Sequence, residues 1–389
     1  MNTTIRRFFL FYIFVYGGQA IYNTFLPLYF DDIGFSTIQI GMILSIGPFV
    51  AMLAQPLWGM LSDRSTSKNK VLYILLAGTG FAMLIFPLST SYSYVLFTIC
   101  LFTLFQTSIF AISDTITLES LDKMRVGSFG HIRMGGTFGF AVMSITFGFI
   151  AKNNLTAMFP IYALLMIVCL FLVYKFPNIA GHRTKGSKIS FLTLFQNKKL
   201  MIFLGFNFIL QITLGFYYSF FPIYFRELGG DSSLLGWSMV ISSLSEVPFL
   251  LYADRIFRRV KIQTILLLSA VATCLRWLLF YWVETPLAAL PIQLLHGAMF
   301  IVLTVTMATY INKEVPKELK ASGQTFNGLL NLGVARIIGS LAGGAATAAV
   351  GYRQVFLYNA WISIISTILF ASLLLYWARK ERKTKQANV

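Results

Sequence analysis

The sequence predicts an all-α membrane protein with twelve transmembrane helices in two six-helix halves. Three observations support this prediction: the number and length of apolar runs, the distribution of Lys and Arg between them, and a repeat at half the chain length. The 389 residues are 57% hydrophobic and only 12% charged, whereas a soluble domain is about 25% charged. This composition excludes a soluble globular protein.

Apolar runs of about 20 residues are long enough to cross a bilayer, and the chain contains twelve of them. The predicted spans are 8–30, 37–61, 71–89, 93–117, 130–151, 156–176, 200–225, 232–253, 262–283, 287–311, 321–349 and 352–378.

Lys and Arg divide unevenly between alternate connecting segments. Twenty-five lie on the side of the amino terminus, and three, Lys152, Arg226 and Arg353, lie on the other. Because positively charged segments stay in the cytoplasm, we predict a multi-pass protein of a bacterial plasma membrane with both termini cytoplasmic. The net charge of +17 is then a topology signal, and we expect a lipid bilayer as partner and no nucleic acid.

The three cysteines, Cys100, Cys169 and Cys274, all lie within predicted spans. No metal-ligand spacing, catalytic Ser-His-Asp grouping or phosphate loop is visible. We therefore expect no enzyme activity, no metal and no cofactor beyond a proton as coupling ion.

A repeat divides the chain in the middle. The segment at 25–34 (FLPLYFDDIG) returns at 220–229 (FFPIYFRELG), so that Pro27 and Pro222 lie 195 residues apart. We predict an N-terminal six-helix half at 1–176, a cytoplasmic linker at 177–199 with a short surface helix at 189–195, and a C-terminal half with a short basic tail at 200–389.

A short basic loop follows the second span and carries Gly59, Asp63 and Arg64, and a weaker copy in the second half carries Asp254 and Arg255. The pattern Gly-x-Leu-x-Asp-Arg resembles the loop between spans two and three of the major facilitator superfamily. With the twelve spans and the repeat, this resemblance covers the whole chain. It implies the major facilitator fold and a substrate site near the midplane between the halves.

The five loop residues are candidate gating residues. We expect Gly59 to let two helix backbones approach closely, and Asp63 to pair with a basic residue or a helix N-terminus of a neighbour. Part of the basic character of the loop also follows from topology alone.

The segment from Gly130 through Arg133 to Gly139 resembles the start of span five in phenylpropionate permease-like and lactose permease-like proton symporters. Glu246, Arg276 and the stretch 293–297 are similar to the phenylpropionate permease-like group. Lactose permease would carry His and its acidic partner on one span, so a sugar substrate is not implied.

Ionisable residues within spans are costly and are usually functional. Glu246 is the sharpest candidate, because no basic residue lies within one helical turn of it. We predict that it carries the coupled proton, with Arg276 as charge partner and His296 nearby; the alternative is a static ion pair. His296 is a proton relay, a donor to substrate or a packing residue, and Asp114 is the next candidate for coupling.

Asp114, Glu119 and Arg133 either lock a cytoplasmic gate or contact substrate, and Glu119 is alternatively solvated. Polar residues at helical spacing on other spans are candidate substrate contacts. The full set of these candidates is Gln19, Tyr22, Asn23, Arg133, Asn207, Gln211, Tyr217, Gln293, His296, Asn327 and Arg336.

These features favour a monomeric, proton-coupled secondary active transporter, a symporter that imports a small polar or aromatic organic solute by alternating access. The alternative is a proton-driven efflux antiporter for drugs or amphiphiles, which the absence of a proline from span five disfavours. A non-transporting membrane sensor is a third interpretation, disfavoured by the lack of a soluble domain.

Overall fold

The computed structural model describes residues 3–124, 129–181, 196–316 and 319–387. Within these ranges all regular structure is helical, as the sequence predicted. The surface helix expected at 189–195 lies outside the described residues.

Contacts divide the chain into two units: Met1–Gly186 with Tyr218–Val240, and Ser187–Tyr217 with Ile241–Val389. The division into halves at 1–176 and 200–389 remains a prediction.

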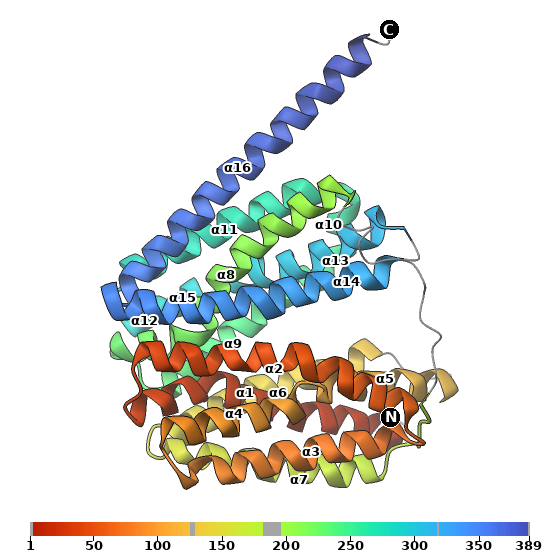
Figure 1. Ribbon diagram of the computed structural model, residues 1–389, viewed down its shortest axis with the longest axis vertical. Helices are drawn as coiled ribbons and strands as arrows, with labels where there is room; N and C mark the ends of the chain where they lie inside the picture. Colours follow the sequence, from red (N-terminus) through yellow and green to blue (C-terminus); the bar gives the residue numbers. More distant parts are fainter. Residues whose placement is uncertain (1–2, 125–128, 182–195, 317–318, 388–389) are drawn as a thin grey trace. The chain divides into compact units, whose positions relative to one another are not determined.

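The first seven α-helices and their short 3-10 helices lie in the first unit, where Figure 1 shows α1–α7 side by side. Their bounds are α1 Thr3–Asp32, α2 Thr37–Arg64, α3 Lys68–Ile85, η1 Phe86–Leu88, α4 Tyr92–Gln106, α5 Ile109–Met124, α6 Phe129–Ala151, η2 Leu155–Ala157 and α7 Met158–Tyr174.

The remaining helices begin with α8, which runs through both units, and α9, most of which is counted with the first unit. Their bounds are α8 Lys198–Glu227, α9 Ser232–Leu244, α10 Val247–Arg259, α11 Ile262–Trp282, α12 Pro286–Ile292, η4 Gly297–Ile301, α13 Val302–Glu314, α14 Lys320–Gly328, η6 Leu329–Val334, α15 Ala335–Val350 and α16 Tyr352–Ala387.

The repeat is visible in helix boundaries. α1 covers residues 3–32 and α8 covers residues 198–227, an offset of 195 at both ends. Each is followed by a glycine with positive φ, Gly34 (83°) and Gly229 (88°), a conformation that glycine adopts without strain. The next helix is then capped at equivalent positions, by Ser36 for α2 and by Asp231 for α9.

Eleven helical stretches among the described residues are long and apolar enough to cross a membrane. The twelfth predicted span, α1, is a continuous helix of 30 residues but is not in this group. Its apolar residues are interspersed with Gln19, Asn23 and several tyrosines, which lower its hydropathy. The architecture is that of a multi-pass helical membrane protein.

Close packing in each unit comes from small residues and stacked rings. In the first unit α1 and α6 cross so tightly that a Cβ on Gly139 would lie 2.1 Å from the carbonyl oxygen of Ile13. In the second unit the ring of Phe203 stacks on Tyr310 with centroids 4.3 Å apart. Leu303 and other buried side chains extend this core.

Three spans of the second half are interrupted. α9 gives way to α10 at residues 245–246, and π-helical segments separate α12 from α13 and α14 from α15. In a bilayer the backbone groups released by such breaks need partners within the protein. These interruptions therefore mark positions where side chains take over hydrogen bonding.

Candidate functional site

Glu246 lies where the eighth span is interrupted. α9 ends at Leu244 and α10 begins at Val247, with Pro248 in its first turn. Because proline lacks an N–H and clashes with the preceding turn, the backbone leaves the regular helix at Ser245 and Glu246. The carboxylate is 23% exposed and lies within a stretch that is otherwise apolar enough to cross a membrane.

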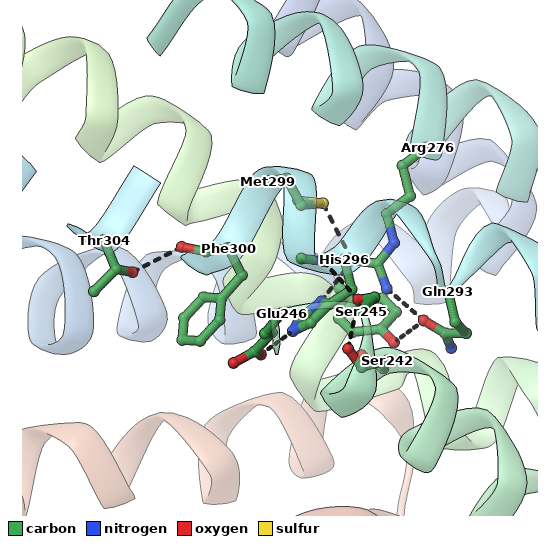
Figure 2. Close-up of polar contacts among 11 residues, drawn as sticks. Ser242, Ser245, Glu246, Arg276, Gln293, His296, Met299, Phe300 and Thr304 are labelled. Carbon is green, nitrogen blue, oxygen red and sulfur yellow. Dashed lines mark hydrogen bonds and ion pairs between the residues drawn. The ribbon is translucent and has the colours of Figure 1, made fainter. Parts of the chain in front are cut away.

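The carboxylate of Glu246 contacts the imidazole of His296. Nε2 of His296 lies 3.3 Å from Oε1 of Glu246, and Nη1 of Arg276 lies 3.0 Å from Nδ1 of the same ring (Figure 2). Since a guanidinium only donates, Nδ1 accepts and a neutral ring carries its proton on Nε2, facing Glu246. Glu246 therefore contacts His296, where the sequence predicted Arg276 as its charge partner.

Arg276 on α11 is fully buried. Its Nη2 donates to Oε1 of Gln293 at 2.5 Å, and that oxygen also accepts from the hydroxyl of Tyr217 at 2.8 Å. Its Nη1 lies 3.2 Å from the Met299 sulfur, and its guanidinium lies 4.2 Å from the centroid of the Tyr217 ring. These contacts offset the cost of a buried cation.

A continuous chain of contacts in the second unit, here named the Glu246 network, joins Tyr217, Gln293, Arg276, His296 and Glu246. Arginine stays charged and glutamine is neutral, so Glu246 and His296 are the members whose side chains can bind or release a proton. A proton bound by Glu246 removes its charge and weakens its contact with the Nε2–H of His296. The contact joins two interrupted spans, and its role in proton coupling stays a prediction.

Asp114, the other coupling candidate, belongs to a separate network in the first unit. Its Oδ1 accepts from the Tyr12 hydroxyl at 2.5 Å, and its Oδ2 accepts from Nη1 of Arg133 at 2.6 Å. The guanidinium lies 5.2 Å from the centroid of the Tyr16 ring, and the Arg133 side chain is 42% exposed. The network joins α1, α5 and α6, and its role as gate or substrate contact stays a prediction.

The loop between α2 and α3 is held by the segment that follows α7. The N–H of Lys68 donates to the carbonyl of Ile179 at 2.7 Å, and the N–H of Gly181 donates to the carbonyl of Ser65 at 3.0 Å. The buried ammonium of Lys68 pairs with Glu119, so Glu119 is not simply solvated.

No close helix approach at Gly59 is seen within the first unit, and the expected approach stays a prediction. A Cβ built on Gly59 would meet no heavy atom within 4 Å among the described residues. Asp63 and Arg64 are exposed, as are Asp254 and Arg255 on α10. Within the described part of the chain Asp63 forms no ion pair, and its pairing with a basic residue or a helix N-terminus stays a prediction.

Two basic residues of the first unit, Arg226 and Lys152, form ion pairs near helix ends. Arg226 at the end of α8 pairs with Asp31, at 3.4 Å, and with Asp32. Lys152 after α6 lies 2.9 Å from Asp231 before α9. They join α1 to α8 and α6 to α9 in a region where the sequence analysis predicted no site.

The substrate candidates on α1 differ in exposure: Gln19 and Tyr22 are partly buried and Asn23 is exposed. On α8, Asn207 and Gln211 are each only 1% exposed. Their side-chain oxygens have no hydrogen-bond partner among the described residues. Leaving a buried polar atom unpaired costs about 1–3 kcal/mol, and the role of these two residues as substrate contacts stays a prediction.

The last candidates lie on the π-helical segment η6 and its neighbours. Asn331 donates to Oδ1 of Asn327 at 2.5 Å, while its own buried Oδ1 has no partner among the described residues. Arg336 lies partly buried on α15. Asn327 and Asn331 are thus brought together, as their helical spacing predicted.

A family model described as MFS_1 like family matches residues 5–358. The chain belongs to the MFS_1 like family. It is therefore a secondary transporter that spans a lipid bilayer and carries a small-molecule substrate, and not an enzyme.

Relatives of this MFS_1 like chain match it almost end to end. The uncharacterized transporter YwbF of Bacillus subtilis (strain 168) is 25% identical over 98% of this chain and 97% of its own. The maltose permease of Geobacillus stearothermophilus is 25% identical over 96% of this chain and 94% of its own length. The crystal structure of the nucleoside transporter NupG matches with a TM-score of 0.87 and 20% identity, over 96% of this chain and 99% of that one, and supports the fold.

Several residues that contact the candidate residues of this MFS_1 like chain could not be identified from the sequence. Tyr12 and Met299 are ordinary members of apolar runs, and Lys68 is one of several charges in a basic loop. Ser245 had one available signal, since the proline at 248 predicts a break in the preceding turn.

Proposed function

We propose that the chain is a proton-coupled symporter that imports a small polar organic solute by alternating access, with Glu246 as the proton-binding group. The observation that carries the proposal is the contact between Glu246 and a His296 ring whose other nitrogen is held by the buried Arg276. With Arg276 charged and His296 neutral, an ionised Glu246 balances the network, and a proton on Glu246 leaves one uncompensated buried cation.

This imbalance supplies a mechanism for coupling. A buried net charge is costly in a membrane, so the protonated network favours a different arrangement of the interrupted spans, and transported solute selects among the same conformations. Each proton that enters down a membrane potential of 100 mV then releases about 2.3 kcal/mol, which can drive accumulation of the solute.

The solute class follows from the unpaired acceptors. Asn207, Gln211 and Asn331 each bury a side-chain oxygen without a partner among the described residues. Oxygen acceptors favour a ligand rich in hydroxyl or N–H donors. The names of the relatives, a maltose permease and a nucleoside transporter, make sugars and nucleosides the first solutes to test, with aromatic acids as a third class. We propose further that the transporter is monomeric, has cytoplasmic termini and binds no nucleic acid.

The test begins with a thermal-shift screen of purified protein against these three classes. Hits are then measured in proteoliposomes with an imposed proton gradient, an imposed sodium gradient, or neither. The proposal predicts solute accumulation only when the proton gradient is directed inward with the solute. Accumulation driven by the sodium gradient would show that sodium, and not the proton, is the coupling ion. Proton-driven expulsion of the solute would support the efflux alternative.

A further inference from the structure

Two interrupted spans touch beside the Glu246 network. The eighth span breaks at Ser245 and Glu246, between α9 and α10, and the tenth span becomes π-helical at Gly297, directly after His296. Ser245 and Gly297 make the contact between the two spans. Glu246 directly follows Ser245 in the sequence, and His296 directly precedes Gly297. π-helical segments within spans often occur at functional sites.

The approach of the two backbones excludes any side chain at position 297. A Cβ built on Gly297 would lie 2.0 Å from the carbonyl oxygen of Ser245, 2.3 Å from its carbonyl carbon and 2.7 Å from the nitrogen of Glu246. All three atoms are backbone, so no rotamer change could relieve the clash. Ordinary contacts need about 3.5 Å, which means that the turn at 245–246 would have to move by more than 1 Å.

A hydrogen bond sets the register of the same contact. The N–H of Gly297 donates to Oγ of Ser245 at 2.8 Å, and that hydroxyl donates to the carbonyl of Ser242 at 2.6 Å (Figure 2). The hydroxyl thus ties the start of the π-helical segment to the last turn of α9.

The π-helical side of the contact is itself anchored. Oγ of Ser269 on α11 donates to the carbonyl of Met299 at 3.1 Å. The ring of Phe300 stacks on His296 with centroids 5.3 Å apart. Displacement at Gly297 would therefore be taken up by the turn that carries Glu246.

We propose that the contact between Ser245 and Gly297 sets the distance between Glu246 and His296, which makes Gly297 a positioning residue for proton coupling. This inference rests on the proposed function of Glu246. With the contact intact, the carboxylate lies 3.3 Å from the imidazole. A shift of more than 1 Å separates the pair beyond hydrogen-bonding distance.

The test compares Gly297→Ala with Gly205→Ala in proteoliposomes. Gly205 lies on α8, and a Cβ there meets nothing within 4 Å among the described residues. Both substitutions bring the same gain in helix propensity, so they differ in the backbone clash. Substrate counterflow, which needs no gradient, is measured beside accumulation on an imposed proton gradient.

Gly297→Ala should keep counterflow within about twofold of wild type and lose at least fivefold of the proton-driven accumulation, while Gly205→Ala keeps both. Combined with Glu246→Gln it should cause no further loss of accumulation, since both changes act on one step. An equal loss of counterflow and accumulation would make Gly297 a packing residue and overturn the inference, as would full accumulation.

Ser245→Ala removes the hydroxyl without steric strain and decides the matter if Gly297→Ala does not fold. It should lose at least twofold of the driven accumulation with counterflow retained, and wild-type accumulation would overturn the inference. If Glu246→Gln alone accumulates normally, the proposed function itself fails. If Glu246→Gln is uncoupled but these variants are not, the positioning role alone fails.

Discussion

Nε2 of His296 lies 3.3 Å from Oε1 of Glu246, at a point where the two spans that carry them are both interrupted. The other nitrogen of the ring accepts from Arg276. A carboxylate, a neutral imidazole and a fixed cation thus lie in one line of contacts, which is the arrangement on which the proposed coupling depends.

Arg276→Lys should abolish most transport although it keeps the charge. The guanidinium reaches His296 with one nitrogen and Gln293 with the other, and a lysine ammonium cannot reproduce this fork. We expect at least a tenfold loss of initial uptake rate, about 1.4 kcal/mol. Arg353→Lys is the matched control, because Arg353 makes one bond to the Val283 carbonyl. Similar rates for Arg276→Lys and wild type would contradict the assigned role.

Glu119→Gln should destabilise the protein. It leaves the ammonium of Lys68, whose side chain is 5% exposed, without its charge partner, and breaking a buried pair costs about 3–5 kcal/mol. The melting temperature of detergent-purified protein should fall, and Lys68→Met in the same chain should recover much of the loss. A double variant no more stable than Glu119→Gln would show that the pair is not what stabilises this loop.

The cap of α9 should be pH-dependent. The N–H of Leu234 and then the ammonium of Lys152 hold the pKa of Asp231 below its usual 3.8. A carboxyl whose pKa is lowered by folding stabilises the fold above its unfolded pKa and loses this contribution as the pH falls through its folded pKa. Wild type should exceed Asp231→Ala by about 1 kcal/mol at neutral pH.

Thermal melts between pH 7 and pH values below that 3.8 reference measure this effect, with Asp231→Asn as the control that keeps a capping oxygen. The difference between wild type and Asp231→Ala should shrink at the acidic end. A difference that stays constant over the range would mean that the charge of Asp231 contributes nothing.

The orientation in the membrane can be tested by cysteine labelling in intact cells. After replacement of the three native cysteines, Asn153→Cys, exposed after α6, should react with a membrane-impermeant maleimide. Lys70→Cys, exposed at the start of α3, should react only after the cells are opened. The reverse pattern would place both termini outside the cytoplasm.

The sequence predicted the fold because its signals are local. Span length, loop charge and the repeat of 25–34 at 220–229 need no knowledge of distant contacts, and α1 and α8 indeed have equivalent ends. The cost of burying charge also singled out Glu246, Arg276 and His296, which the structure brings together.

The finer geometry depended on contacts that no local pattern encodes. The order in which Arg276 and His296 approach Glu246 follows from how α11 packs against the tenth span. The contact between Ser245 and Gly297 joins residues 52 positions apart. At Gly59 the motif predicts a close helix crossing that is not seen within the first unit.

The central claim is that Glu246 binds the coupled proton, and Glu246→Gln in proteoliposomes tests it most directly. Glutamine keeps the shape and hydrogen-bonding capacity of the protonated acid but cannot release a proton. The account predicts counterflow within about twofold of wild type, and no accumulation of solute on an imposed proton gradient. Accumulation at the wild-type rate would contradict it, make Glu246 a member of a static ion pair and leave Asp114 as the next candidate.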